Sequence, residues 1–293
     1  MDTMDNTAYI EPQKLHFRLT GGIGNKEYPI DLRSSAELLV LFQSIIDKSY
    51  CVLSGKKRLS SKGQSDCQIL IKNLHVGSLE SEMILLTSFV LPLAGLSNPK
   101  TIWDYSCMAL DYFKRLVSAL QNKDSVHTNM ESHGDNSPNI LILSVNGDVH
   151  TYPPEIAEIV KQSEPLYKDI SQAMNRGNFS SFHVGQTNND LNFEINQSEQ
   201  SLFCKNNIIS KESQPFVVDI IDFNKENSRG KLRVLLGEMA SCQFPFSVVG
   251  DQSPLIYINA MQSPQVTINA LVETTNSVSP KIVRLHITSL SEA

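Results

Sequence analysis

The sequence predicts an α+β protein in which an N-terminal mixed sheet with packed helices precedes a small all-β barrel or sandwich. Three features of the chain indicate this fold class. Helical apolar periods are confined to the part before Phe179, short strand-like segments follow it, and a polar stretch over residues 196–214 marks a boundary. We therefore expect a flexible arm over residues 1–13, an α+β domain over 14–200 and a barrel-like domain over 213–293.

The clearest helix is expected over residues 34–50. Ser34 and Glu37 have the spacing of a capping box, in which a hydroxyl and a carboxylate satisfy free N–H groups at a helix start. Apolar residues then recur at helical spacing, and Phe42 and Ile46 meet on one face because they are four residues apart. That face should cover a sheet, which we expect from residues 15–19, 68–74 and 78–86, the last two as a hairpin.

Further helices are expected in the same part of the chain. Thr101 opens one of them. Pro153 suits the start of another, which should run to about residue 162, because proline needs no N–H partner there. Pro165 then opens a separate helix that Gly177 ends.

Residues 122–138 are almost wholly polar and carry no apolar period, which predicts a mobile surface loop. The strongest short turn signal of the chain follows at Asn146 and Gly147. It predicts a hairpin between strands at 139–145 and 149–152.

After Phe179 the apolar residues fall into short segments between polar turns. Many short strands at close spacing are typical of a small barrel or sandwich, so we expect no helix longer than two turns in the last eighty or so residues. The expected strands cover residues 179–184, 191–195, 216–223, 231–236, 244–249, 255–258, 265–271 and 282–290.

Composition narrows the classes of function. The 293 residues are 41% hydrophobic and 19% charged, which fits a packed core rather than a disordered chain. The formal net charge of -6 argues weakly against a sequence-independent grip on nucleic acid. Five scattered cysteines fit reduced thiols. Because such thiols are typical of the cytosol, we expect a cytoplasmic protein. The most apolar run, residues 83–96, is too short to cross a bilayer, so we expect no membrane contact.

Familiar catalytic and metal-binding patterns are each incomplete. The glycine turn at residues 21–26 lacks both the helix that a phosphate-binding loop enters and the third glycine of a dinucleotide fingerprint. Asp66 and Lys72 have nuclease-like spacing, but the acidic residue two positions before Lys72 is missing. Glu80 and Glu82 fit a solvated strand face. We expect no catalytic residue and no cofactor.

One group of potential metal ligands lies in the polar segment. His127, Glu131, His133 and Asp135 fall within nine residues. Structural zinc sites favour cysteine and histidine on stiff turns, whereas half of these ligands are acidic. We expect no metal site here. His16 and His286 each lie mid-strand and fit a satisfied or half-exposed strand face.

The most basic segment is a candidate contact surface for nucleic acid or a partner. It consists of Lys56, Lys57, Arg58, Lys62 and Lys72. The barrel offers a second possibility, because oligonucleotide-binding barrels stack bases on aromatic side chains. Its aromatic residues occupy apolar strand positions and fit a core equally well; they are Phe216, Phe223, Phe244, Phe246 and Tyr257.

Three segments carry a resemblance: residues 15–46, residues 74–86 with the stretch Gly-Ser-Leu-Glu, and the closing run from Gly230 to the strand Val-Arg-Leu-His-Ile. Together they resemble an uncharacterised group of bacterial and phage-associated proteins, in which an α+β domain precedes a small barrel-like domain. The resemblance implies a cytoplasmic prokaryotic or phage setting, including mobile elements or antiviral defence. It implies no chemistry and no site residue.

The expected function is that of a non-enzymatic interaction protein that binds a protein partner or self-assembles. Exposed strand edges, which invite pairing with another chain, support this hypothesis. Nucleic-acid binding through the basic segment at residues 56–72 or the barrel is the first alternative. An enzyme with an unfamiliar site is the second.

Overall fold

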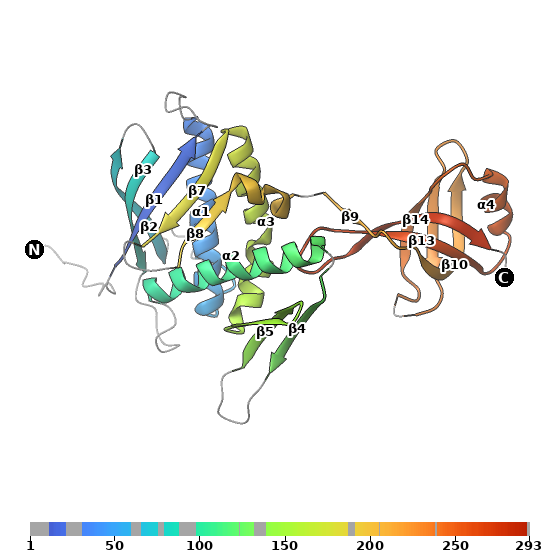
Figure 1. Ribbon diagram of the computed structural model, residues 1–293, viewed down its shortest axis with the longest axis horizontal. Helices are drawn as coiled ribbons and strands as arrows, with labels where there is room; N and C mark the ends of the chain where they lie inside the picture. Colours follow the sequence, from blue (N-terminus) through green and yellow to red (C-terminus); the bar gives the residue numbers. More distant parts are fainter. Residues whose placement is uncertain are drawn as a thin grey trace, which may run out of the picture. The chain divides into compact units, whose positions relative to one another are not determined.

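The computed structural model describes residues 12–21, 31–59, 66–75, 79–87, 98–122, 124–131, 139–186, 191–204, 206–237 and 239–291. Most of the expected N-terminal arm, most of the glycine turn and Lys62 lie outside the described residues. The chain divides into two compact units, residues 1–204 and residues 205–293 (Figure 1). The first unit contains both helices and sheets and the second contains a closed five-stranded barrel, so the predicted fold class is confirmed.

A five-stranded sheet in the order β2-β3-β1-β7-β8 forms the base of the first unit, and every neighbouring pair is antiparallel. Residues of β1 are alternately buried and exposed, as expected for a sheet with one covered face. The predicted β2–β3 hairpin pairing is confirmed. The strands are β1 (Gln13–Gly21), β2 (Cys67–His75), β3 (Leu79–Thr87), β7 (Phe179–Gly185) and β8 (Phe193–Asn196).

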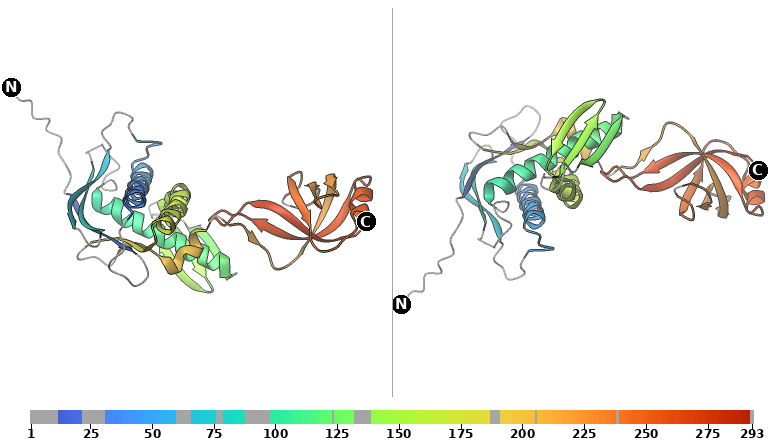
Figure 2. Two further views of the ribbon diagram at one scale, coloured as in Figure 1. Left: turned by 90° about the horizontal axis from the view of Figure 1, so that it is seen from above. Right: turned by 90° about the horizontal axis from the view of Figure 1, so that it is seen from below.

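Three long helices pack together over the sheet (Figure 2). They are α1 (Leu32–Leu53), α2 (Pro99–Asn122) and α3 (Glu155–Arg176). The ring of Phe42 lies 6.3 Å from that of Trp103 on α2, and 5.8 Å and 5.2 Å from the rings of Phe182 on β7 and Phe193 on β8. Phe42 and Ile46 are fully buried, which confirms the prediction that this face of α1 covers the sheet.

The helix ends differ from those that the sequence predicts. Helix α1 is capped by Asp31, whose carboxylate accepts hydrogen bonds from the backbone N–H groups of Arg33 and Ser34. The Ser34–Glu37 capping box is therefore wrong, and Glu37 instead pairs with Arg176 at 2.6 Å. An aspartate one turn earlier supplies a charged acceptor, which outcompetes a serine hydroxyl.

Two more helix boundaries need correction. Helix α2 begins before Thr101, because the Asn98 side chain accepts a hydrogen bond from the Thr101 N–H at 2.8 Å. Helix α3 continues through Pro165, where the sequence predicts two separate helices. Its apolar stripe, which includes the fully buried Ile159 and Ile170, runs along both halves, and burying it outweighs the lost backbone hydrogen bond.

A three-stranded sheet in the order β4-β5-β6 accompanies the helices. Strands β5 (Ile140–Val145) and β6 (Asp148–Tyr152) form the predicted hairpin, with Asn146 and Gly147 at positive φ as its turn requires. The predicted loop at 122–138 is wrong for β4 (Val126–Glu131), which pairs along its whole length with β5. Backbone pairing supplies the stabilisation that its polar side chains lack.

The second unit is a closed barrel. Its strand order is β10-β11-β12-β14-β13, and pairing of β13 with β10 closes the cylinder. Strand β12 runs parallel to β14, while the other barrel pairs are antiparallel. The strands are β10 (Gln214–Asn224), β11 (Arg229–Val234), β12 (Gln243–Val248), β13 (Val266–Thr274) and β14 (Ile282–Ser291). Two short elements precede it: the 3-10 helix η1 (Gln197–Phe203) and β9 (Ile208–Ile209).

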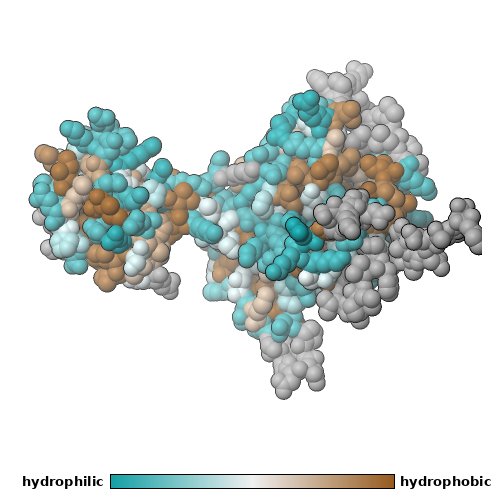
Figure 3. All heavy atoms as spheres, turned by 180° about the vertical axis from the view of Figure 1, so that it is seen from behind, coloured by the Kyte–Doolittle hydropathy of each residue, from teal (hydrophilic) through white to brown (hydrophobic). Residues whose placement is uncertain are grey.

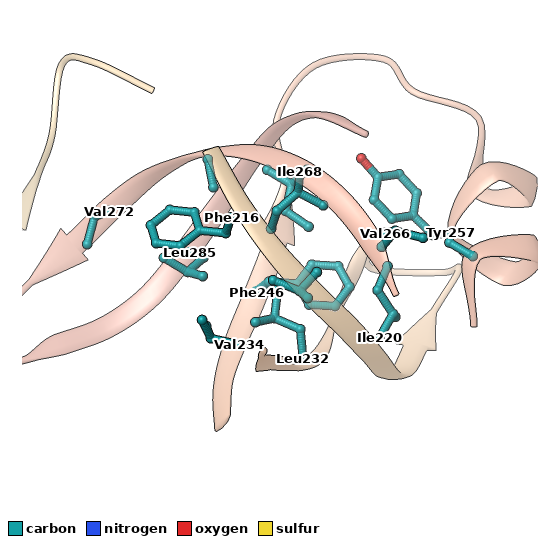
Figure 4. Packing of buried hydrophobic residues seen from close by; sticks show 14 residues of the cluster. Phe216, Ile220, Leu232, Val234, Phe246, Tyr257, Val266, Ile268, Val272 and Leu285 are labelled. Atoms are coloured by element: carbon teal, nitrogen blue, oxygen red, sulfur yellow. The ribbon is translucent and has the colours of Figure 1, made fainter. Parts of the chain in front are cut away.

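Side chains fill the interior of the barrel (Figure 4). Phe216, Leu232 and Phe246 are among its fourteen buried core residues. Residues 255–258, predicted as a strand, instead belong to the helix α4 (Pro254–Ala260). Pro254 in its first turn is favourable for a helix start, and the buried Tyr257 and Ala260 have helical spacing. With seven residues, α4 confirms the expected two-turn limit for the described part of the barrel.

Candidate interaction surfaces of the barrel

The structure does not bring the predicted basic residues into one binding surface. The Lys56 ammonium lies 2.7 Å from the Asp66 carboxylate and 3.2 Å from the Tyr50 hydroxyl, so its charge is already neutralised within the fold. Lys57 and Arg58 are exposed beyond the end of α1, and Lys72 is exposed on β2. Lys62 lies outside the described residues.

Helix α4 presents an apolar outer surface instead. Tyr257 and Ala260 are buried in the barrel core, and the other residues of this short helix after Pro254 are exposed. We call the exposed large apolar residues of this segment the α4 surface: Leu255 (64% exposed), Ile256 (43%), Ile258 (37%) and Met261 (39%). Apolar residues at the surface of the barrel unit are visible in brown at the left of Figure 3.

Packing and hydrogen bonds of Tyr257 attach the α4 surface to the barrel core. The Tyr257 ring stacks on Phe223 at 5.0 Å and lies 6.2 Å from Phe246. Its hydroxyl donates to the Gln252 side-chain oxygen at 2.6 Å, and the Gln252 amide donates to the carbonyl of Val249 at 2.7 Å. Burial raises the pKa of Tyr257 to about 12, which extends the pH range over which the hydroxyl remains a donor. The helix is held in one orientation by this anchor.

A basic row follows the outer face of β11. Arg229, Lys231 and Arg233 are exposed, while Leu232 and Val234, at the alternate positions, face the core. The alternation of basic and apolar residues over 229–234 is readable in the sequence, although the prediction of a basic surface rested on residues 56–72.

Acidic residues on the neighbouring strand offset part of this charge. Asp222 lies opposite Lys231, and Asp219 lies opposite Arg233 with 3.8 Å between the carboxylate and the guanidinium. Residues 205–293 contain eight basic and eight acidic side chains, so the barrel unit has no formal net charge.

A chain of polar side chains crosses three strands on the outside of the barrel. The Ser247 hydroxyl on β12 lies 2.7 Å from Nδ1 of His286 on β14. Nε2 of His286 lies 3.0 Å from the Glu273 carboxylate on β13, which also accepts from the Asn207 amide at 2.7 Å. The hydrogen bonds from Asn207 and His286 hold the pKa of Glu273 below its usual value. His286 therefore lies on a satisfied strand face, one of the two settings that the sequence predicts for it, with partners on other strands that the sequence does not identify.

This serine–histidine–carboxylate order is that of a hydrolase triad, but its setting differs. Catalysis of acyl transfer needs N–H donors aimed at the oxygen that becomes negative. Ser247 lies on an interior strand, paired with Arg229 on β11 and His286 on β14, so the ladder on both sides already engages the backbone of its strand. The arrangement therefore fits a structural role, in which side-chain hydrogen bonds link β12, β14 and β13 on the outside of the barrel.

The described residues contain no group of three or more histidine, cysteine or acidic side chains arranged to hold a metal ion. His127 and Glu131 lie on β4, whereas His133 and Asp135 lie outside the described residues. None of the helices in the described part of the chain has the length and hydropathy needed to span a membrane.

Comparisons with known proteins found no matching protein family, no similar curated protein and no similar solved structure. The connectivity of the barrel still gives a topological parallel. Its first strand pairs with its second and fourth, its third runs parallel to its fifth, and a helix joins the third to the fourth. Oligonucleotide- and oligosaccharide-binding (OB) barrels have this five-stranded Greek-key connectivity. A shared topology does not imply a shared ligand.

Proposed function

We propose that the protein is a non-enzymatic interaction protein whose barrel binds a partner protein through the α4 surface. One observation carries this proposal: four large apolar side chains are exposed on and next to a helix of two turns that is anchored to the core through Tyr257. Contiguous exposed apolar surface lowers solubility and is typical of interaction sites. Packing of the barrel core does not explain these four side chains, because α4 contributes only Tyr257 and Ala260 to the core.

The chemistry around α4 favours a protein over other ligands. Residues 252–265 contain no charged side chain, so the segment lacks the basic residues with which amphipathic helices bind anionic membranes. Side chains fill the barrel interior, so an apolar small molecule finds no room there. A short apolar helix with a polar border fits a groove on another protein.

Site-specific photo-crosslinking tests this proposal in cells that produce the full chain. A photoreactive amino acid replaces Leu255 in one variant and Leu236 in the other. Leu236 is a matched control, because it is 65% exposed on the same unit but lies outside the α4 surface.

We expect one dominant crosslinked protein from position 255, which position 236 does not yield. Its purified form should bind the wild-type chain and lose at least tenfold in affinity for Leu255→Lys, as truncated interface anchors do. Equal products from both positions, or unchanged affinity of Leu255→Lys, would contradict the proposal.

The basic row of β11 favours a second candidate function, binding of single-stranded nucleic acid. In OB barrels the face of the second and third strands binds oligonucleotides, and Arg229, Lys231 and Arg233 lie on the second strand here. The opposing Asp219 and Asp222 weaken this candidate. Fluorescence anisotropy with a labelled single-stranded oligonucleotide tests it: binding should fall steeply with salt and vanish in the triple alanine variant. Binding that is independent of these three residues would exclude it.

A further inference from the structure

We propose that strand β4 is a second, separate interaction surface, through which two copies of the chain pair edge to edge. An edge strand offers unpaired backbone N–H and C=O groups, and folded proteins normally cover or disrupt such edges. The described edges of the open sheets differ sharply in this respect.

Strand β2 has a protected edge. The Gln43 side chain from α1 binds it like a piece of neighbouring strand: its amide donates to the Cys67 carbonyl at 3.2 Å, and its oxygen accepts from the Ile69 N–H at 2.9 Å. A register shift between Ile71 and Asn73 further disrupts the edge.

The edge strands β8 and β6 also differ from an open, regular edge. Strand β8 has only four residues and leads directly into η1. Strand β6 is tied to α2, because the Tyr152 hydroxyl donates to the Asp111 carboxylate at 2.7 Å and His150 lies 3.3 Å from the Arg115 guanidinium. The first edge is therefore too short to offer more than a few backbone groups, and the second belongs to a strand that is held against a helix.

Strand β4 differs from these edges in its register, its composition and its exposure. Its six residues pair with β5 in an unbroken register, without a bulge. Its sequence, Val-His-Thr-Asn-Met-Glu, contains no proline, lysine or arginine. Residues 127–130 are all exposed, so side chains on both faces of the strand are open to solvent. Among the described strands, β4 is therefore the best template for an added strand.

The sequence of β4 suits a second copy of itself. Antiparallel pairing about a two-fold axis at Thr128 places Thr128 opposite Thr128 of the second copy, His127 opposite Asn129 and Val126 opposite Met130. Each cross-strand pair is free of like charges, which would otherwise destabilise the pairing. Such a symmetric interface closes at two copies. The net charge of -6 lies wholly on residues 1–204, so added salt should screen repulsion and strengthen the pairing.

Analytical ultracentrifugation of the full chain over a range of concentrations tests the proposal. We compare wild type with Thr128→Lys, which puts a charge on the β4 edge, and with the matched control Thr151→Lys on β6, since both threonines are exposed in the same sheet. A third variant, Leu255→Lys, shows whether two copies pair through the α4 surface instead of through β4. Circular dichroism confirms that each variant is folded.

Wild type and Thr151→Lys should form dimers whose dissociation constant falls with salt. Thr128→Lys should raise that constant at least tenfold, and Leu255→Lys should leave it unchanged. A monomeric wild type, an unaffected Thr128→Lys dimer or a dimer lost in Leu255→Lys would overturn the proposal. The last result would leave the α4 proposal intact, so the two can fail independently.

Discussion

The two units deal with strand edges in opposite ways. The barrel joins β10 to β13 and thereby removes its edges, apart from the two-residue β9 that extends the sheet. The open sheets of residues 1–204 keep their edges and cover them one at a time, with Gln43 on β2 as the clearest device. The two units therefore differ in the kind of group that they leave exposed to solvent without a partner in the fold. The barrel leaves apolar side chains on α4, whereas the open sheets leave backbone groups on β4.

The largest expected change in the free energy of unfolding comes from a substitution in the core of the first unit. Phe42→Ala removes a buried ring that contacts α2, β7 and β8, and should destabilise the unit by about 3–5 kcal/mol. Trp103, the chain's one tryptophan, lies in this core, so its fluorescence in a urea titration follows the first unit alone. Val40→Ala on the same helix, 66% exposed, should shift the transition by less than about 0.5 kcal/mol. Equal behaviour of the two variants would refute the core assignment.

A substitution in the barrel should spare the tryptophan signal. At Gly230 an added Cβ would lie 2.2 Å from the Asp222 carbonyl oxygen and 2.7 Å from the Phe246 ring. Gly230→Ala should therefore cost about 1–3 kcal/mol or more, because β10 and β11 must separate. Far-ultraviolet circular dichroism should show early loss of strand signal while the Trp103 transition stays in place. A shift of both transitions together would mean that the units unfold as one.

The pH dependence of the first unit should report on Asp47, beside the protected edge of β2. Burial raises its pKa from 3.8 to about 6, although Gln43 donates a hydrogen bond to it at 2.7 Å. A carboxyl group with a raised folded-state pKa stabilises the fold below pH 4, and this contribution is lost as pH rises towards 6. Asp47→Asn should gain stability relative to wild type over that window, as measured by urea unfolding at pH 4.5 and 7. A constant difference between the two proteins would contradict the assignment.

The smallest effects concern the basic segment. Lys56→Ala breaks a half-buried ion pair with Asp66 and should cost at most about 1 kcal/mol. The double variant Lys57→Ala and Arg58→Ala should change the melting temperature hardly at all, since both side chains are exposed. Thermal unfolding of the three proteins makes this comparison. If Lys56→Ala and the double variant lower the melting temperature equally, the ion pair with Asp66 contributes no measurable stability.

Local signals in the sequence predicted much of the fold. The Asn146–Gly147 turn and the apolar stripe through Phe42 depend on neighbouring residues, and both were confirmed. Residues 255–258 were mistaken for a strand because a run of four apolar residues fits either element. Strand β4 was missed because its stabilisation comes from pairing with β5, to which its own side chains give no clue.

The candidate surfaces were harder to predict than the elements. The exposure of Leu255 follows from which side of α4 the buried Tyr257 and Ala260 occupy, and that requires the tertiary structure. The chain from Ser247 through His286 to Glu273 joins residues from three strands that are brought together by barrel closure. Sequence alone showed a basic segment at 56–58, but not that Lys56 is already bound to Asp66.

Amide hydrogen exchange at two protein concentrations tests most directly the claim that the fold leaves β4 open while it protects the other edges. If two copies pair through β4, the amides of this strand that point away from β5 should exchange more slowly at the higher concentration. The amides of β2 and β6 should exchange at the same rates at both concentrations. Exchange in β4 that is independent of concentration, or equal slowing in β6, would contradict the account.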